Sequence, residues 1–402
     1  MPRGRRPDST DSRGGGARGD RAAFTRAVLC LACVAGLLLS HRLYLSRASY
    51  PMSPVLDGLP PIPVPFDHIL LGSLLVALAV AAVAPSPRPF LVGALGLALS
   101  LAVWDQSRWQ PWLYQYLLML SAFLPGASRA KEGDGALDTC RLVLVALYLW
   151  SGLQKLNVTF VTTVFPWLVE PLTRLLPTPL REWLAGAGLA VPLVETAIAL
   201  ALLLPRWRQA AVILAVALHA SVLLLLGPLG HAVNPVIWPW NVAMGLLVVL
   251  LFWGVPVPAR QILGPARMGW QAVVAVLVLV MPLLSVVGLW DAYLSGALYS
   301  GNIREAVIVV TPAVKARLPA EARRHVVTNR TGAELLVVAD WSMAELGAPP
   351  YPEARVYRAV ARSVCGLAAA PADVALVTFG KPGPWTGTRV TTREDCGVLG
   401  SR

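Results

Sequence analysis

Two ionisable side chains stand deep inside apolar stretches of this sequence. Glu195 lies in VPLVETAIALALL, and His219 lies in ILAVALHASVLLLL. A charge within a bilayer is costly unless it is paired or hydrated, so such residues often mark a proton path or a ligand site. Because a short loop joins the two stretches, they are predicted to be antiparallel neighbours, with both side chains about 12–14 Å below the outer surface. A Glu195–His219 contact would relay protons or hold a ligand's polar head; the alternative is a polar clamp between helices.

A lysine stands at the end of another apolar stretch, LYLWSGLQKLN. A lysine in this place commonly extends its ammonium group to water, and Lys155 is open to that interpretation. Alternatively, a lysine held partly out of water loses basicity and serves as a general base. Gly152, one turn earlier, would let another backbone or a ligand come close to this turn.

Further polar side chains crowd two predicted outer turns. In WDQSRWQPWLYQY, Asp105 and Arg108 are expected to pair across one turn, while Tyr114 and Tyr116 would hydrogen-bond a quinone or lipid head group. Asn241, in HAVNPVIWPWN, is a similar candidate. The alternative is an ordered turn with interfacial aromatic residues. Neither segment has the ligand number or spacing of a metal site, so no metal is predicted.

The composition is that of a membrane protein. Of 402 residues, 56% are hydrophobic and only 14% are charged, whereas soluble domains carry about 25% charged residues. A span needs about 20 apolar residues, and nine stretches qualify, the third and fourth being the shortest. They are residues 24–43, 66–84, 89–104, 112–126, 138–156, 186–204, 209–227, 237–256 and 270–289. The proline-broken segment 157–185 is amphipathic and is predicted to lie in the membrane interface.

The distribution of lysine and arginine predicts the orientation. Residues 1–23 are rich in arginine and glycine and are predicted to be a disordered basic tail. The tail and the inner loops carry fifteen basic residues against six in the outer loops, which places the N-terminus in the cytoplasm. The Ala-, Arg-, Gly- and Pro-rich composition is typical of a bacterium, so the expected location is the inner (plasma) membrane. The net charge of +12 is spread thinly, which argues against a nucleic-acid partner.

The character of the chain changes after residue 289. Strands are predicted for IREAVIVVT, ELLVVADW and DVALVTFG, and a helix for PEARVYRAVARSV. Nine spans would place residues 290–402 outside the cytoplasm, where Cys365 and Cys396 would form either a disulfide or two unpaired thiols. The predicted fold class is therefore an all-α polytopic membrane bundle, residues 24–289, with a small C-terminal α+β extracytoplasmic domain.

The stretch LYLWSGLQKLN, followed by an amphipathic segment and a Glu-bearing helix, resembles a known membrane domain. It is shared by vitamin K-dependent γ-glutamyl carboxylases and bacterial HTTM proteins, and is related to the DoxX-like and MauE-like four-helix proteins. The resemblance covers about residues 100–256. It implies that Lys155 is the catalytic base at the outer face and that His219 matches a histidine of the carboxylases. The sequence departs from them at Gln154, where they have a lysine, and at Val222, where they have an asparagine.

Two function hypotheses follow. The first is a quinone- or lipid-linked membrane enzyme acting at the extracytoplasmic face. A hydroquinone would lie between the fifth to eighth spans, Lys155 would be the base, Glu195 and His219 would relay protons, and the turn 105–116 would form part of the pocket wall. The second is a non-catalytic DoxX- or MauE-like anchor or redox-assembly factor that docks an extracytoplasmic protein through residues 290–402. A transporter is disfavoured, since the sequence shows no duplicated halves.

Overall fold

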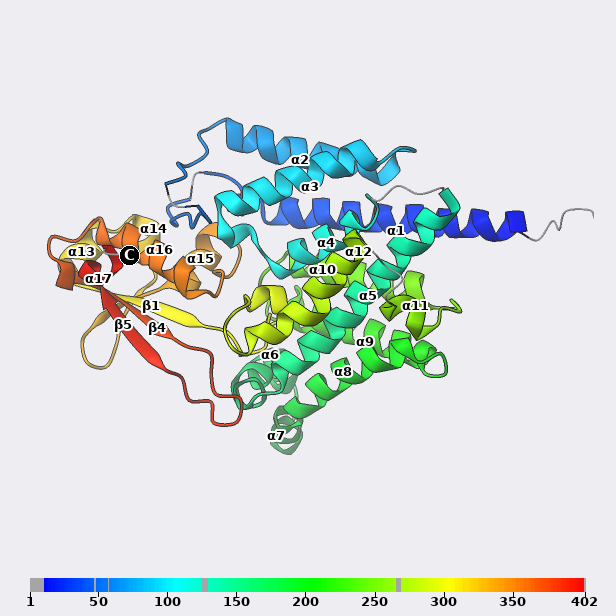
Figure 1. Cartoon of the computed structure of the whole chain (residues 1–402). Helices are drawn as coiled ribbons and strands as arrows, with labels where there is room; N and C mark the ends of the chain where they lie inside the picture. Colours follow the sequence, from blue (N-terminus) through cyan, green and yellow to red (C-terminus); the bar gives the residue numbers. More distant parts are fainter. Residues whose placement is uncertain (1–10, 47, 57, 125–128, 265–268, 401–402) are drawn as a thin grey trace, which may run out of the picture.

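The computed structural model describes residues 11–400 except 47, 57, 125–128 and 265–268. It shows a bundle of helices with a small domain of strands and short helices at one end (Figure 1). The helices of the bundle are α1 (Asp11–Leu39), α2 (Phe66–Val83), α3 (Arg88–Trp104), α4 (Pro111–Ser121), α5 (Arg129–Lys155), α6 (Phe165–Thr173), α7 (Thr178–Gly186), α8 (Ala190–Leu203), α9 (Arg208–Leu226), α10 (Ile237–Phe252), α11 (Ala259–Leu263) and α12 (Trp270–Ala275). Short turns complete it: η1 (His41–Leu43), η2 (Gln106–Arg108), η3 (Phe160–Val164), η4 (Ala187–Leu189), η5 (Val276–Val280), η6 (Met281–Ser285) and η7 (Tyr293–Ser295).

Several helices are long and apolar enough to cross a bilayer. In the described part of the chain there are five, namely Gly19–Leu39, Phe66–Val83, Gly135–Lys155, Thr178–Leu203 and Arg208–Leu226. Three shorter apolar runs match further predicted spans, namely Arg88–Trp104, Ile237–Phe252 and Trp270–Ser285. The other predicted span, 112–126, contains the 11-residue helix α4, which is only about 16 Å long, roughly half the hydrocarbon thickness. The multi-helix membrane character is confirmed, and the count of nine full spans is not.

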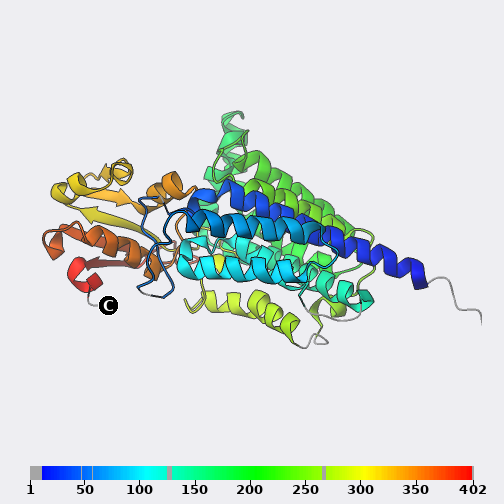
Figure 2. The same ribbon diagram turned by 90° about the horizontal axis from the view of Figure 1, so that it is seen from above.

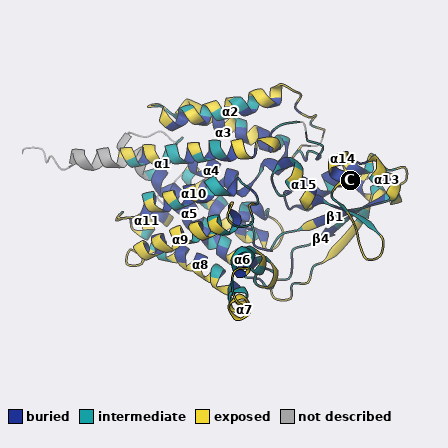
Figure 3. Cartoon of the chain, turned by 180° about the vertical axis from the view of Figure 1, so that it is seen from behind, coloured by how far each residue is buried: buried dark blue, intermediate teal, exposed yellow. Residues whose placement is uncertain are grey.

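The outer faces of the bundle are apolar, as expected where helices face lipid. Figure 3 shows exposed residues on the outward sides of α2, α8 and α9, and buried residues on the inward sides. Val76 on α2 and Ile213 on α9 expose 63% and 59% of their surface. Monomeric soluble proteins rarely expose large contiguous apolar patches. These faces are therefore suited to a bilayer.

Helix α5 lies at the centre of the bundle. Of its apolar window, 78% is buried, against 28–33% for the other long helices. It packs most closely on α8. Helix α8 in turn contacts α9, α9 contacts α10, α10 contacts α1, and α1 contacts α5 again. Gly152 permits this close packing, because a Cβ there would lie 2.5 Å from Thr196 Oγ1 and 2.8 Å from the Pro192 carbonyl oxygen. Small residues allow helix backbones to approach in this way.

The segment before α8 is interrupted as its prolines predict. Residues 160–186 form the π-helical turn η3 and the short helices α6 and α7. Leu175 and Trp183 expose 82% and 71% of their surface. The interfacial position of this segment stays a prediction, since residues from Thr178 onward belong to the candidate span Thr178–Leu203. At the N-terminal end of the described chain, α1 begins at Asp11. Residues 11–23 are thus helical, contrary to the predicted disordered tail, and residues 1–10 lie outside the described part.

The C-terminal domain is built on an antiparallel sheet. Its strand order is β2-β3-β1-β4-β5, and Ile308 on β1 lies between Leu336 and Leu376, all three fully buried. The strands are β1 (Glu305–Val310), β2 (Val326–Thr328), β3 (Glu334–Val337), β4 (Val374–Phe379) and β5 (Thr391–Asp395). The helices are α13 (Pro312–Arg317), α14 (Ala320–Arg323), α15 (Val338–Leu346), α16 (Ala354–Cys365), η8 (Pro371–Asp373) and α17 (Cys396–Gly400).

The sequence predicted four elements of this domain. The strands predicted at 303–311 and 373–380 and the helix at 352–364 are confirmed as β1, β4 and α16. The strand predicted at 334–341 is wrong in its second half. There, Val338, Trp341 and Ser342 share the buried face of helix α15, a spacing that fits a helix and not a strand.

The domain and the start of the first helix lie at opposite ends of the bundle. Both views show the N-terminal end of α1 on the side away from the sheet (Figures 1 and 2). We call the end of the bundle next to the sheet the domain end. A disulfide joins Cys365 at the end of α16 to Cys396 at the start of α17, so the bridged alternative is the one that the structure contains.

Candidate functional site

A cavity of about 240 Å³ lies inside the bundle. Its walls come from α4, α5, α6, α8, α9 and α10, from the turns η5 and η6, and from the segment around η7. Most of the lining is apolar, and the polar side chains are few. They are Tyr114, Gln115, Tyr148, Ser151, Lys155, Glu195, His219, Ser221, Asn241, Tyr293, Ser295 and Tyr299. An apolar pocket with a few convergent polar groups is the usual form of a small-molecule site.

One polar group in the wall is a buried ion pair. Lys155 Nζ lies 2.9 Å from Glu195 Oε2, and the two side chains expose 9% and 7% of their surface. The ammonium also donates to the hydroxyl and the carbonyl oxygen of Ser151. Lys155 ends α5, where the helix dipole favours a cation. The close contact at Gly152 brings α8, and with it the Glu195 carboxylate, against this turn.

The second polar group is a chain of three side chains. His219 Nδ1 lies 2.8 Å from Asn241 Oδ1, and His219 Nε2 lies 2.7 Å from the Tyr148 hydroxyl. The Asn241 amide nitrogen donates to the Ile237 carbonyl oxygen, so its oxygen faces the ring and His219 Nδ1 is the donor. In the neutral imidazole, Nε2 then accepts the proton of Tyr148. The phenol oxygen keeps its own lone pairs for a further donor.

Two buried donors beside the cavity have no partner in the described structure. These are the Tyr114 hydroxyl and the Trp150 indole N–H, and both residues line the cavity. A buried polar group left without a hydrogen bond costs about 1–3 kcal/mol. A ligand oxygen in the cavity would satisfy such donors.

The structure brings together five of the eight residues proposed from the sequence. Lys155, Glu195, His219, Tyr114 and Asn241 all line the cavity. The expected contact between Glu195 and His219 is wrong, however. Glu195 is bonded to Lys155, while both ring nitrogens of His219 are occupied by Tyr148 and Asn241. Sequence spacing predicted the neighbouring helices but could not resolve which side chains meet.

The other three proposed residues lie away from the cavity. Asp105 accepts from the backbone N–H groups of Ser107 and Ser53. Arg108 donates to the carbonyl oxygens of Leu43 and Leu101. Tyr116 is fully buried, with its ring edge-on to the Trp112 ring. The expectation that the turn 105–116 forms part of the pocket wall is confirmed for Pro111, Tyr114 and Gln115. It is wrong for Asp105, Arg108 and Tyr116, because α4 directs Tyr114 and Tyr116 to different sides.

This turn instead supports the C-terminal domain. Gln106 accepts a hydrogen bond from Arg355, and Gln110 donates to the Pro349 carbonyl oxygen at 3.3 Å. A second support is the loop after α1, where Ser49 donates to Glu345 on α15. The residues after α5 are a third support, since the Val158 N–H donates to the Pro384 carbonyl oxygen at 2.8 Å. The domain is therefore docked on several segments of the bundle as well as on the chain between η6 and β1.

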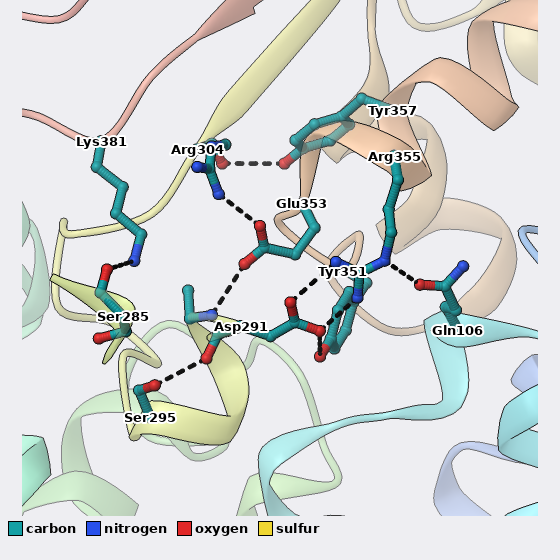
Figure 4. A network of polar contacts seen from close by, with 11 residues as sticks. Gln106, Ser285, Asp291, Ser295, Arg304, Tyr351, Glu353, Arg355, Tyr357 and Lys381 are labelled. Carbon is teal, nitrogen blue, oxygen red and sulfur yellow. Dashed lines mark hydrogen bonds and ion pairs between the residues drawn. The ribbon is translucent and has the colours of Figure 1, made fainter. Parts of the chain in front are cut away.

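A polar network joins the chain between η6 and β1 to the C-terminal domain (Figure 4). Asp291 is paired with Arg355 and accepts from the Tyr351 hydroxyl, and Glu353 is paired with Arg304. Burial raises the pKa of Glu353, while the Ala292 N–H and the Arg304 guanidinium oppose that shift. Burial lowers the pKa of Lys381, which donates to the Ser285 carbonyl oxygen.

Sequence reasoning missed Tyr148, Ser151 and Gln115 as lining residues. A signal was present for the first two, since Tyr148, Ser151 and Lys155 recur at three- and four-residue spacing on one helix face. Gln115 gave no such signal, because it lies in a segment rich in aromatic residues. Its side-chain oxygen accepts from the Trp240 indole N–H at 2.8 Å.

Comparison with known proteins adds no identity to this geometry. No family model matches the chain, and neither a curated protein nor a solved structure matches it. The functional argument therefore stands on the cavity and its side chains.

Proposed function

We propose that this protein is a membrane enzyme that binds a hydroquinone-type ligand in the bundle cavity and removes a proton from it. The observation that carries the proposal is that Lys155, Glu195 and His219 line one apolar cavity. Buried ionisable groups within a membrane are costly and are typically retained for function. Their meeting at one cavity favours a shared site over three separate structural roles.

The proposal includes an orientation for the chain. The run of helices crosses the bilayer nine times, and α4 belongs to the fourth crossing. The N-terminus lies in the cytoplasm and residues 290–402 lie outside. The opposite placement of α1's start and the domain supports an odd number of crossings. The Cys365–Cys396 disulfide supports an oxidising compartment for the domain.

The ion pair supplies a base after one internal proton transfer. The low dielectric of the site disfavours two charges, and the Lys155 Nζ proton can pass to Glu195 across 2.9 Å. Lys155 then carries a neutral amine, the form that accepts a proton. Ser151 holds the amine at the cavity wall through its hydroxyl.

The cavity fits a single substituted ring. A dry cavity of about 150 Å³ holds benzene, and this one measures about 240 Å³. The unpartnered Tyr114 hydroxyl and Trp150 N–H are donors for a ring oxygen, and the Tyr148 oxygen is an acceptor for a ring hydroxyl. A hydroquinone would bring an ionisable hydroxyl and, once deprotonated, a reducing ring.

One observation favours a second candidate, the non-catalytic anchor. Lys155 is already satisfied by Glu195 and by both oxygens of Ser151, as expected of a structural clamp between α5 and α8. In that case the C-terminal domain would be the working part, docking an extracytoplasmic protein.

The test is to purify the protein in mild detergent, extract it with organic solvent, and identify a stoichiometric quinone by absorbance and mass. Glu195→Gln should lose the ligand, and Lys155→Ala should retain or weaken it while abolishing proton transfer. Glu170→Gln is a matched control, because Glu170 pairs with Arg174 on the exposed face of α6. Preparations without any quinone, or equal retention in all three variants, would overturn the enzyme proposal and favour the anchor.

A further inference from the structure

The cavity is lined on the side of the sheet by a segment that belongs to neither the long helices nor the sheet. We call residues 291–299, which include the turn η7, the cap segment. Six of its nine residues line the cavity: Tyr293, Leu294, Ser295, Gly296, Leu298 and Tyr299. The bundle therefore does not complete the cavity by itself.

The C-terminal domain holds the first part of the cap segment. The Asp291 carboxylate accepts from the Arg355 guanidinium, with Nη1 to Oδ1 at 2.9 Å, and from the Tyr351 hydroxyl at 2.6 Å. The Ala292 N–H donates to Glu353 at 2.9 Å. The Tyr293 ring packs edge-on against the Tyr351 ring, with centroids 5.6 Å apart. Figure 4 shows Asp291 and Glu353 side by side between the segment and the start of α16.

These contacts come from one side only. In the described part of the chain, the side-chain hydrogen bonds that residues 291–297 receive from elsewhere come from Tyr351, Glu353 and Arg355. On the bundle side the contacts of this stretch are apolar or steric. Tyr293 packs in a cluster with Trp109, and a Cβ on Gly296 would lie 3.3 Å from the Ser151 backbone nitrogen. Release of residues 351–355 would thus remove the polar restraints on this stretch.

Of these contacts, the ion pair between Arg355 and Asp291 can reach water, whereas Tyr351 and Glu353 are buried. The Arg355 and Asp291 side chains expose 50% and 20% of their surface, unlike Lys155 and Glu195 deeper in the cavity wall. Pairs that are partly exposed contribute little net stability and exchange readily with solvent. The contact is therefore suited to reversible opening.

The far end of the cap segment is backbone-strained. In the described chain, the non-glycine residues with positive φ are Ala232, Asn234 and Tyr299. Asn234 donates to the Tyr299 hydroxyl at 3.3 Å, and the Tyr299 ring stacks near Trp167. Strained residues of this kind concentrate at ligand clamps and switch regions, where the strain is held by surrounding contacts.

We propose that the C-terminal domain is the latch of the cavity. Docking of residues 351–355 on Asp291 and Ala292 keeps the cap segment over the cavity, and its release opens the domain end of the cavity to water. Ligand access is then controlled from outside the bundle, which gives the C-terminal domain a function in the same site. The ligand itself rests on the proposed function, whereas the opening of the cap does not.

The test uses a thiol reporter inside the cavity. Leu118 lines the cavity, exposes 7% of its surface, and belongs to neither polar group. In the full-length Leu118→Cys protein, the rate of reaction with a charged methanethiosulfonate reagent measures how often the cavity opens to water. The buried free cysteines Cys30, Cys33 and Cys140 are accounted for with the parent protein.

The latch variants are expected to react faster. Asp291→Ala and Arg355→Ala should each raise the labelling rate roughly three- to tenfold, because the rate follows the population of the open form. The double variant should be accelerated by less than the product of the two single effects, since both single variants remove the shared Asp291–Arg355 contact. Glu334→Gln is the control, because Glu334 pairs with Lys315 in the same domain away from the cap segment.

Two outcomes would overturn the latch. One is an unchanged labelling rate in folded Asp291→Ala and Arg355→Ala proteins; the other is equal acceleration by Glu334→Gln. If the alanine variants do not fold, Arg355→Lys keeps the charge but loses the two-pronged contact, and it should show the same acceleration to a smaller extent. Labelling needs no bound quinone, so failure of the proposed ligand leaves this result interpretable.

Discussion

At the residue scale, the site consists of two separate polar groups where the sequence indicated one. Lys155 and Glu195 neutralise one another, and Tyr148, His219 and Asn241 satisfy one another. Each group is internally complete apart from lone pairs and protons that face the cavity. This explains how ionisable side chains persist in an apolar bundle, because a buried charge or polar atom is tolerated only when it is paired.

The ion pair should be strongly coupled. Glu195→Leu or Lys155→Met alone leaves an uncompensated buried charge and should destabilise the protein by roughly 3–5 kcal/mol. The double variant Lys155→Met with Glu195→Leu should recover most of this loss. Thermal unfolding in detergent checks the cycle, and additive losses in the double variant would contradict the coupling.

The tyrosines on either side of the cavity should respond differently. Tyr148→Phe leaves His219 Nε2 buried without its donor and should cost roughly 1–3 kcal/mol. Tyr114→Phe should leave the ligand-free protein at least as stable as before, because it removes a buried hydroxyl that has no partner in the described structure. It should instead reduce quinone retention. Equal unfolding temperatures for the two variants would argue against the hydrogen-bond chain.

At the element scale, the packing of α5 on α8 decides whether the site exists. Lys155 and Glu195 come from different helices, and their 2.9 Å contact requires that the two backbones approach closely. Gly152 provides this approach, with Thr196 and Pro192 against the place where a side chain would stand.

Gly152→Ala should therefore separate α5 from α8. The added Cβ would overlap Thr196 and Pro192, and overpacking of this kind costs roughly 1–3 kcal/mol. Quinone retention should fall together with stability. Gly93→Ala in α3 is the matched control, since nothing lies within 4 Å of its added Cβ. A Gly152→Ala protein that keeps both its stability and its ligand would show that the helices can adjust.

The disulfide stabilises one element of the C-terminal domain. It joins α16 to α17 across 31 residues, and closing a loop of that size is worth roughly 3–4 kcal/mol in the chain-entropy estimate. Cys365→Ser with Cys396→Ser should lower the unfolding temperature of the domain. Proteolysis should then cut residues 366–395 first, while the bundle stays intact; unchanged protease resistance would contradict this.

At the scale of the whole molecule, the bundle and the domain are packed together through several separate contacts. The domain docks on the loop after α1, on the turn before α4 and on the cap segment, which are far apart in sequence. The chain's own connection between the two parts lines the cavity. The C-terminal domain is thus placed where it can sense or control the cavity.

The proposed orientation makes a direct prediction. Alkaline phosphatase is active only where disulfides form. It should be active when fused after residue 402, and inactive when fused after Gly254, which follows α10 at the end of the bundle away from the C-terminal domain. A fluorescent protein that folds only in the cytoplasm should give the reverse pattern. Active phosphatase at both sites, or the reversed pattern, would contradict nine crossings with a cytoplasmic N-terminus.

The sequence by itself determined the class of this protein and its most unusual side chains. Apolar length indicated a membrane bundle, and hydrophobic alternation indicated a C-terminal sheet, because both patterns are local and reflect a single burial environment. Glu195 and His219 stood out for the same reason, since an ionisable residue within an apolar run is costly wherever the helix packs.

Only the tertiary structure decided which of these side chains meet. The rotation of α8 and α9 about their axes places Glu195 on Lys155 and His219 on Tyr148, and helix rotation is set by packing between neighbours that are distant in sequence. The same holds for Asp105 and Arg108, whose polar turn stabilises backbone turns beside the docked domain. The cap segment had no local signal, because its role arises from the long-range contact between Asp291 and Arg355.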